Sequence, residues 1–285
     1  MKRILMMCII ACATMTTTAQ TDSTAKSPQG DTIHVGGMVI IRKPGDYKDG
    51  DIDKSPKVHN RKTYKSSPVS TNWGIIDIGA ANYEDQTNYS SSGAQAYAPG
   101  SNESWFNLRN GKSVNVNIWF FMQRLRLIKN SVNLKYGFGL ELNNYRYKQN
   151  VRYNGNPAPI PDPPIVILDN TVGRAYEKTK LAADYLTIPM MLNFNFTPNR
   201  NDPFGLSLGA SVGWLYNSRN KTVTSDEGKH KTKDDFDLRE FKISYIAELN
   251  LGEIKFYGSL ATESMYKRGL DITPYTVGIR ISSFD

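Results

Sequence analysis

The chain has 285 residues, a formal net charge of +8 at pH 7 and two cysteines, Cys8 and Cys12, both near its start. Beyond these first residues no run of about 18 apolar residues occurs, so the sequence predicts no helical membrane span. It also contains no Cys/His metal set, phosphate-binding glycine loop or nucleic-acid motif, so we predict no metal, no cofactor and no nucleic-acid partner.

Residues 1–19 have the parts of a signal peptide. Lys2 and Arg3 form a positive start, Ile4 to Ala13 is an apolar run too short to anchor the chain, and small residues lead to Ala19. We therefore expect export and cleavage after Ala19. The alternative is a lipoprotein signal ending at Cys12, in which that cysteine would carry the lipid.

Cleavage after Ala19 would remove both cysteines and so exclude a disulfide framework and a thiol nucleophile. Loss of Lys2 and Arg3 would lower the formal charge from +8 to +6. For an exported basic chain we expect outer-membrane lipid and the phosphates of lipopolysaccharide as anionic partners. The alternative is a well-solvated surface with additional lysines.

Residues 20–71 are rich in Lys, Asp, Ser and Pro, a composition that cannot bury enough apolar surface to order itself. We predict a flexible periplasmic segment, either docked in the mouth of a barrel or loose. Inside it, the apolar residues from Thr32 to Arg42 surround Gly36-Gly37 and predict a short strand pair.

From Trp73 onward the side chains alternate along the chain with the period of two that is typical of β-strands. From Val132 to Asn143, large apolar residues alternate with Gly, Asn, Lys and Glu, and from Phe204 to Asn217 they alternate mainly with Gly and Ser. Such strands average to a polar composition, as those of a membrane barrel do, with one face toward lipid.

Eight segments show this pattern: 73–81, 113–121, 132–147, 181–197, 204–217, 238–251, 254–263 and 273–284. The connections alternate between long ones of roughly 31, 33, 20 and 9 residues and short ones of roughly 10, 6 and 2, the asymmetry of outer-membrane barrels. Gly252-Glu253 fits the tightest hairpin turn. We predict an all-β, eight-stranded antiparallel transmembrane β-barrel over residues 72–285, with both chain ends in the periplasm.

Pro189 lies inside the fourth segment, where it cannot donate a hydrogen bond to a neighbouring strand. We expect a β-bulge at this position.

The run from Asp184 to Phe194 (DYLTIPMMLNF) resembles the YLxIPxxLxF segment of PorT-like outer-membrane β-barrel proteins of the Bacteroidetes type. Tyr275 to Phe284 is similar to the closing strand of that family, although Asp285 follows where a terminal aromatic residue commonly serves barrel assembly. The resemblance covers about 73–285. It implies an outer-membrane barrel and offers no catalytic residues.

The alternation places charged side chains of both signs inside the barrel, and an eight-stranded barrel has room only for its own side chains. We therefore predict a structural network of ion pairs rather than a catalytic site, because unpaired charges there would be costly. Its predicted members are Asp77, Lys135, Glu141, Glu240, Lys242, Glu248, Lys255, Glu263 and Arg280.

This pattern favours a non-enzymatic protein, either structural or an interaction platform with long outer loops. A lipid-modifying enzyme is the alternative, but it would need a histidine base, and only His230 lies outside the N-terminal segment. A narrow channel, or an accessory of transport or secretion, is another.

Two outer loops have unusual compositions. The second contains a proline-rich stretch followed by Ile165 to Leu168, which we expect to extend the β-sheet above the membrane, to cover the barrel mouth or to meet a protein partner. The third combines Asp226, Glu227 and other acids with Lys229, Lys231 and Lys233. We interpret it as a mixed-charge loop whose lysines could meet lipopolysaccharide phosphates.

Overall fold

The computed structural model describes residues 31–35, 38–42, 68–128, 131–155, 164–197, 204–252 and 254–281. The predicted signal peptide, including Cys12, and most of the predicted flexible segment lie outside these residues. The chain divides into two units, Met1–Tyr64 and Lys65–Asp285. In the first, β1 (Asp31–Val35) pairs antiparallel with β2 (Met38–Arg42), which confirms the predicted strand pair.

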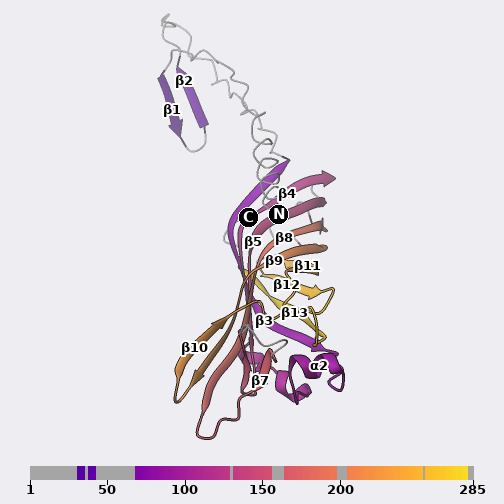
Figure 1. Cartoon of the computed structure of the whole chain (residues 1–285). Helices are drawn as coiled ribbons and strands as arrows, with labels where there is room; N and C mark the ends of the chain where they lie inside the picture. Colours follow the sequence, from indigo (N-terminus) through magenta and orange to yellow (C-terminus); the bar gives the residue numbers. More distant parts are fainter. Residues whose placement is uncertain are drawn as a thin grey trace, which may run out of the picture. The chain divides into compact units, whose positions relative to one another are not determined.

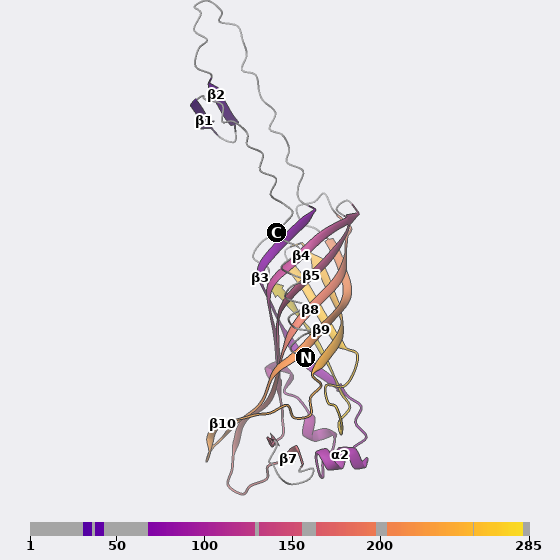
Figure 2. The same ribbon diagram turned by 45° about the horizontal axis from the view of Figure 1, so that its top comes forward.

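The second unit is a closed antiparallel barrel (Figures 1 and 2). Each strand pairs with the next in the chain, and the last pairs with the first, which closes the ring. All eight predicted segments are strands of this ring. They are β3 (Val69–Asp85), β4 (Val114–Ile128), β5 (Val132–Arg146), β8 (Tyr176–Asn195), β9 (Phe204–Thr224), β11 (Phe241–Leu251), β12 (Ile254–Ala261) and β13 (Ile272–Ile281).

The outer wall of the ring is apolar and bare. On β9, Leu208, Val212 and Trp214 keep 48%, 49% and 48% of their surface exposed, whereas the alternate residues Ser207 and Ser211 are buried. A soluble monomer rarely exposes apolar surface on this scale, because water makes it costly. The wall therefore requires a lipid environment, and the period of two places polar side chains in the lumen.

Glycines on the lumen face make room for large inward side chains. A Cβ atom on Gly79 would lie 2.6 Å from the Tyr257 hydroxyl, and one on Gly139 would lie 2.8 Å from the Trp119 ring. No real Cβ tolerates such contacts, so these positions require glycine.

The ladder differs from the expectation at Pro189. The register between β5 and β8 is the same on both sides of Pro189, so the predicted bulge there is wrong. Pro189 pairs with Ser211 on β9. On its other side, Gly137 and Phe138 of β5 form no pairs with β8, while the residues before and after them do. The register shifts lie elsewhere. On β4 they fall between Trp119 and Phe121 and between Arg126 and Ile128, and in the pairing of β8 with β9 they fall between Tyr176 and Lys178 and between Asp184 and Tyr185.

The strands also run further than the alternation predicted. β8 and β9 have 20 and 21 residues, and their ends beyond the ring form a three-stranded extension with β10 (Gly228–Lys233). This extension lies at the same end of the barrel as the long loops (Figure 1). Gly252, with φ of 67°, lies at the opposite end in a tight turn, as a primed hairpin requires.

The long loops fold over the mouth of the barrel into one compact head. They contain α2 (Ser92–Tyr97), the 3₁₀ helices η2 (Glu103–Phe106) and η3 (Asn110–Lys112), and a pair of strands, β6 (Val151–Tyr153) and β7 (Val166–Leu168). Val166 is fully buried, so the apolar run of the second loop covers the mouth, as expected. Among the described residues no helix is long and apolar enough to cross a membrane.

Candidate functional site

The lumen of the barrel is bridged by charged side chains. Arg280 on β13 donates to Asp77 on β3 through Nε at 2.7 Å and Nη2 at 2.9 Å, and its Nη1 donates to Glu248 on β11. Glu248 in turn accepts from Lys135 Nζ at 2.8 Å, and Lys135 lies on β5, three strands away around the ring. This chain of contacts crosses the interior from wall to wall.

A second pair crosses the lumen nearer the head. Lys242 on β11 donates to Glu141 on β5, and its Nζ lies 4.8 Å from the centre of the Tyr185 ring. Asn143 Nδ2 donates to Glu141 at 3.0 Å. Both charged groups are buried, and their mutual pairing with these extra contacts offsets the loss of water.

Neutral side chains complete the network, and the sequence prediction did not name them. Trp119 Nε1 donates to Asp77 at 2.7 Å, and Asn117 Nδ2 donates to the same carboxylate at 3.3 Å. Asn115 links Asn117 and Asn143 at 3.0 and 2.9 Å. All of them occupy inward positions of the alternation, so the pattern that found the charges could also have found these amides.

The structure does not bring every predicted member into this network. Asp77, Lys135, Glu141, Lys242, Glu248 and Arg280 are joined by the contacts above, and Lys255 lines a lumen cavity of about 100 Å³ together with Arg280 and Lys135. Glu240 and Glu263 lie outside it. Glu240 precedes β11 and Glu263 follows β12, where the wall has already opened into loops.

These two glutamates are exposed at the rim of the mouth. Glu263 pairs with Arg239 at 3.2 Å, and Glu240 lies 4.0 Å from Lys267. They line a cavity of about 320 Å³ that also contacts Lys242. The alternation that predicted them inside holds only where the backbone is part of the ring. Both glutamates lie beyond the ring strands, so their assignment to the lumen is corrected to the rim of the mouth.

The space that remains at the centre of the network is small. The cavity between Asp77, Glu141, Glu248 and Arg280 has a volume of about 30 Å³, enough for one water molecule. A substrate does not fit between these side chains, and each of the four charged groups already has a partner. The arrangement is suited to holding the wall together.

The head has a buried aromatic core of its own. The hydroxyl of Tyr153 lies 2.7 Å from that of Tyr147 and 2.6 Å from that of Tyr266, and Tyr97 donates to the carbonyl of Phe236 at 2.7 Å. These residues come from all four long loops. Burial raises the pKa values of Tyr97, Tyr153 and Tyr266, so these hydroxyls stay neutral and act as structural hydrogen-bonding groups.

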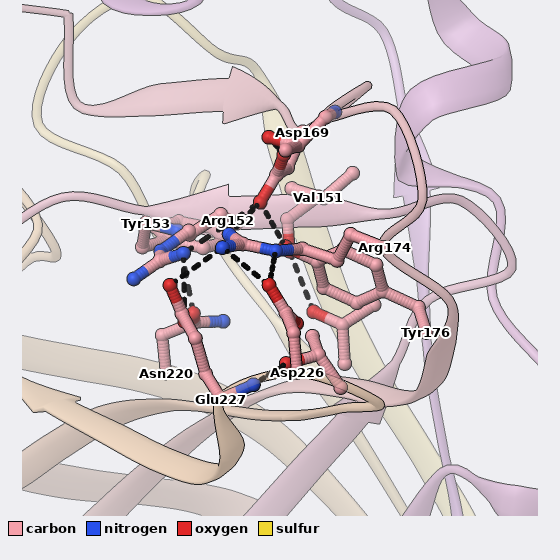
Figure 3. Close-up of polar contacts among 12 residues, drawn as sticks. Val151, Arg152, Tyr153, Asp169, Arg174, Tyr176, Asn220, Asp226 and Glu227 are labelled. Carbon is pink, nitrogen blue, oxygen red and sulfur yellow. Dashed lines mark hydrogen bonds and ion pairs between the residues drawn. The ribbon is translucent and has the colours of Figure 1, made fainter.

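An ion-pair cluster fastens the second loop to the turn between β9 and β10 (Figure 3). Arg174 donates to Asp169 at 2.8 Å and to Glu227 at 2.7 Å, and it pairs with Asp226 at 2.8 Å. Arg152 lies 3.3 Å from Glu227. The acids of the third loop that enter this cluster are thus matched by arginines, and among the described residues no group of metal-ligating side chains is present.

The histidines do not form a site in the part of the chain that the structure describes. His34 lies in β1, and His230 is exposed on β10 opposite Thr222. His59 lies outside the described residues.

A match to a known protein family agrees with this architecture. No curated protein matches the sequence. Among solved structures, the crystal structure of Ail, the attachment invasion locus protein of Yersinia pestis, is similar at 10% identity, with a TM-score of 0.30, over 74% of this chain and 98% of that one. Residues 78–271 match the family described as outer membrane protein beta-barrel domain. The chain belongs to this outer-membrane β-barrel family, and its place is the cell outer membrane.

Proposed function

We propose that this outer-membrane protein is a non-enzymatic, non-conducting platform that displays a folded head at the cell surface. The observation that carries the proposal is the lumen itself, which Lys135, Glu248 and Arg280 bridge between strands β5, β11 and β13. The head core lies over the mouth above them.

Two alternatives have less support. A channel would need a continuous aqueous path, but the centre of the lumen has room for about one water molecule. A lipid-modifying enzyme would need an activated nucleophile beside a base, and His230 is exposed on β10. We therefore favour binding through the outer surface of the head, with lipopolysaccharide and a protein as the proposed partners.

Within the outer-membrane family we propose that the chain belongs to the PorT-like group. The support is the sequence segment from Asp184 to Phe194, which forms the part of β8 that lies in the ring. No catalytic role follows from this resemblance.

The orientation of the head can be tested with two single-cysteine variants. Val172→Cys lies in the head, where Val172 is 99% exposed, and Ser131→Cys is the matched control in an exposed turn at the other end. A membrane-impermeant maleimide should label Val172→Cys in intact cells and Ser131→Cys only after permeabilisation. The reverse labelling would place the head in the periplasm and overturn the proposal.

Conductance and lipid analysis test the other two parts of the proposal. Purified full-length protein in planar bilayers should give no reproducible conductance steps. Lipid A should give the same mass spectrum whether the cells contain the protein, lack it or carry the His230→Ala variant. Steps would establish a channel, and a His230-dependent change in acyl chains would establish an enzyme.

A further inference from the structure

Four cations form a row across the outer surface where the barrel continues into the head. Arg146 on β5 pairs in register with Lys180 on β8, Lys180 pairs with Lys221 on β9, and Lys221 pairs with Lys231 on β10. Adjacent strands are about 4.8 Å apart, so the row spans about 14 Å. In an antiparallel sheet, residues directly opposite each other point to the same face.

Further cations flank this row on the same face. Lys178 and Lys229 both pair with Val223 in the next outward row, and Arg219 pairs with Lys233 on the other side. We call these eight residues the cationic face: Arg146, Lys178, Lys180, Arg219, Lys221, Lys229, Lys231 and Lys233.

Few acids compensate this charge. Asp184 pairs with Arg219 at 2.5 Å, and Glu177 is the other carboxylate on these strand ends. Between described residues, none of the ion pairs involves Lys178, Lys221, Lys229, Lys231 or Lys233. Like charges directly opposite each other destabilise a sheet. An anionic ligand on this face would relieve that repulsion.

The other side of the extension is covered on β8 and β9. Thr179, Leu181, Asn220 and Thr222 alternate with the cations and are buried against the head. On β10 that side is exposed at His230, opposite Thr222. β8 and β9 are therefore fixed from behind, and the cationic face points outward from the same side as the lipid-facing wall.

The position of the row relates it to the membrane surface. The outward residues of β5 run from Phe138, Leu140 and Leu142 to Asn144 and then Arg146. At about 3.3 Å per residue, Arg146 lies roughly 13 Å along the strand from the last apolar side chain, Leu142. Exposed Trp214 and Tyr216 on β9 mark the same boundary, where aromatic residues meet lipid head groups.

We propose that the cationic face binds the phosphate-bearing head groups of lipopolysaccharide in the surrounding outer leaflet. This inference rests on the proposed exposure of the head at the cell surface. Phosphates attached to neighbouring lipids lie at the level of the row, whereas a soluble polyanion would have no reason to match a surface beside the lipid boundary. Several cations in register allow one glycolipid to be held at more than one phosphate.

The test uses the triple variant Lys180→Gln/Lys221→Gln/Lys231→Gln in the full chain. Its control, Arg124→Gln/Lys267→Gln/Arg268→Gln, removes the same charge from exposed positions away from the face. Binding of fluorescent lipopolysaccharide to the detergent-solubilised protein is measured by anisotropy. The triple variant should bind at least roughly tenfold more weakly, since each cation near an anionic surface contributes about a fivefold factor, and the control should bind like the wild type.

A second measurement separates a ligand role from a structural one. In neutral detergent the triple variant should unfold at the same temperature as the wild type or higher, because the repulsion is gone, and lipopolysaccharide should stabilise only the wild type and the control. Equal binding by all three proteins, or undiminished binding of dephosphorylated lipopolysaccharide, would overturn the inference. So would a stronger response to soluble heparin than to lipopolysaccharide. If the cysteine labelling places the head outside the cell, any of these results contradicts the lipopolysaccharide site and leaves the proposed display of the head at the cell surface intact.

Discussion

Asp169 shows how one carboxylate connects segments of the head. It accepts a hydrogen bond from Thr171 Oγ1 at 2.6 Å. It also accepts from the Tyr176 hydroxyl at 2.6 Å and from Arg174 Nη1 at 2.8 Å (Figure 3). Burial by itself raises the pKa of Asp169, but these hydrogen bonds outweigh it, and the pKa lies well below its usual range.

This shift predicts that acid loosens the head. Asp169 has an unfolded pKa of about 3.9, so its contribution to stability is present above that pH and is lost as the pH falls toward the lower folded value. Near-ultraviolet circular dichroism of the head tyrosines should therefore change below about pH 4. Asp169→Asn should weaken the signal at pH 7 and flatten this acid transition; identical profiles for both proteins would contradict the role of Asp169.

At the scale of the elements, the contact between β3, β12 and β13 depends on side-chain size. Tyr257 of β12 lies across the inward glycines of the next two strands, and a Cβ on Gly278 would lie 2.6 Å from its Cε1 atom. Gly258 is the neighbouring glycine with the opposite orientation, and its Cβ would meet nothing closer than 3.7 Å.

This difference predicts opposite outcomes for the same substitution. Gly278→Ala should destabilise the barrel by about 1–3 kcal/mol, because overpacking forces Tyr257 and the backbone to move. Gly258→Ala should change the stability by less than about 0.5 kcal/mol, as an outward surface substitution does. The urea midpoint of the folded, unboiled band on gels measures both, and a similar loss in the two variants would exclude steric conflict with Tyr257 as the cause.

At the scale of the whole molecule, the lumen pairs join strands that are far apart in the ring. Glu141 and Lys242 lie on β5 and β11 and are both buried, so neither charge reaches water if its partner is removed. Removal of one partner of such a buried pair therefore lowers the free energy of unfolding by more than the attraction between the two charges contributes.

A double-mutant cycle tests this dependence. Glu141→Gln alone should cost about 3–5 kcal/mol in urea unfolding, because Lys242 is left buried and unpaired. Glu141→Gln/Lys242→Met should recover most of that loss, since no buried charge remains. Additive losses in the double variant would show that the two side chains act independently.

The sequence alone determined the barrel, because its period of two assigns each side chain to lipid or lumen without reference to distant residues. From Val132 to Asn143 this rule predicted Lys135 and Glu141 inside, and the two side chains line cavities of the lumen. It failed for Glu240 and Glu263, which lie beyond the ends of the ring strands, where alternation no longer fixes the direction of a side chain.

Only the tertiary structure decided the head and its cationic face. Tyr97, Tyr153, Phe236 and Tyr266 belong to different loops and show no common period, so their core exists only after the loops have folded together. In the same way, Arg146, Lys180, Lys221 and Lys231 are separated along the chain and become neighbours through strand register. Local alternation follows from backbone geometry, whereas contacts between distant segments depend on how the whole chain closes.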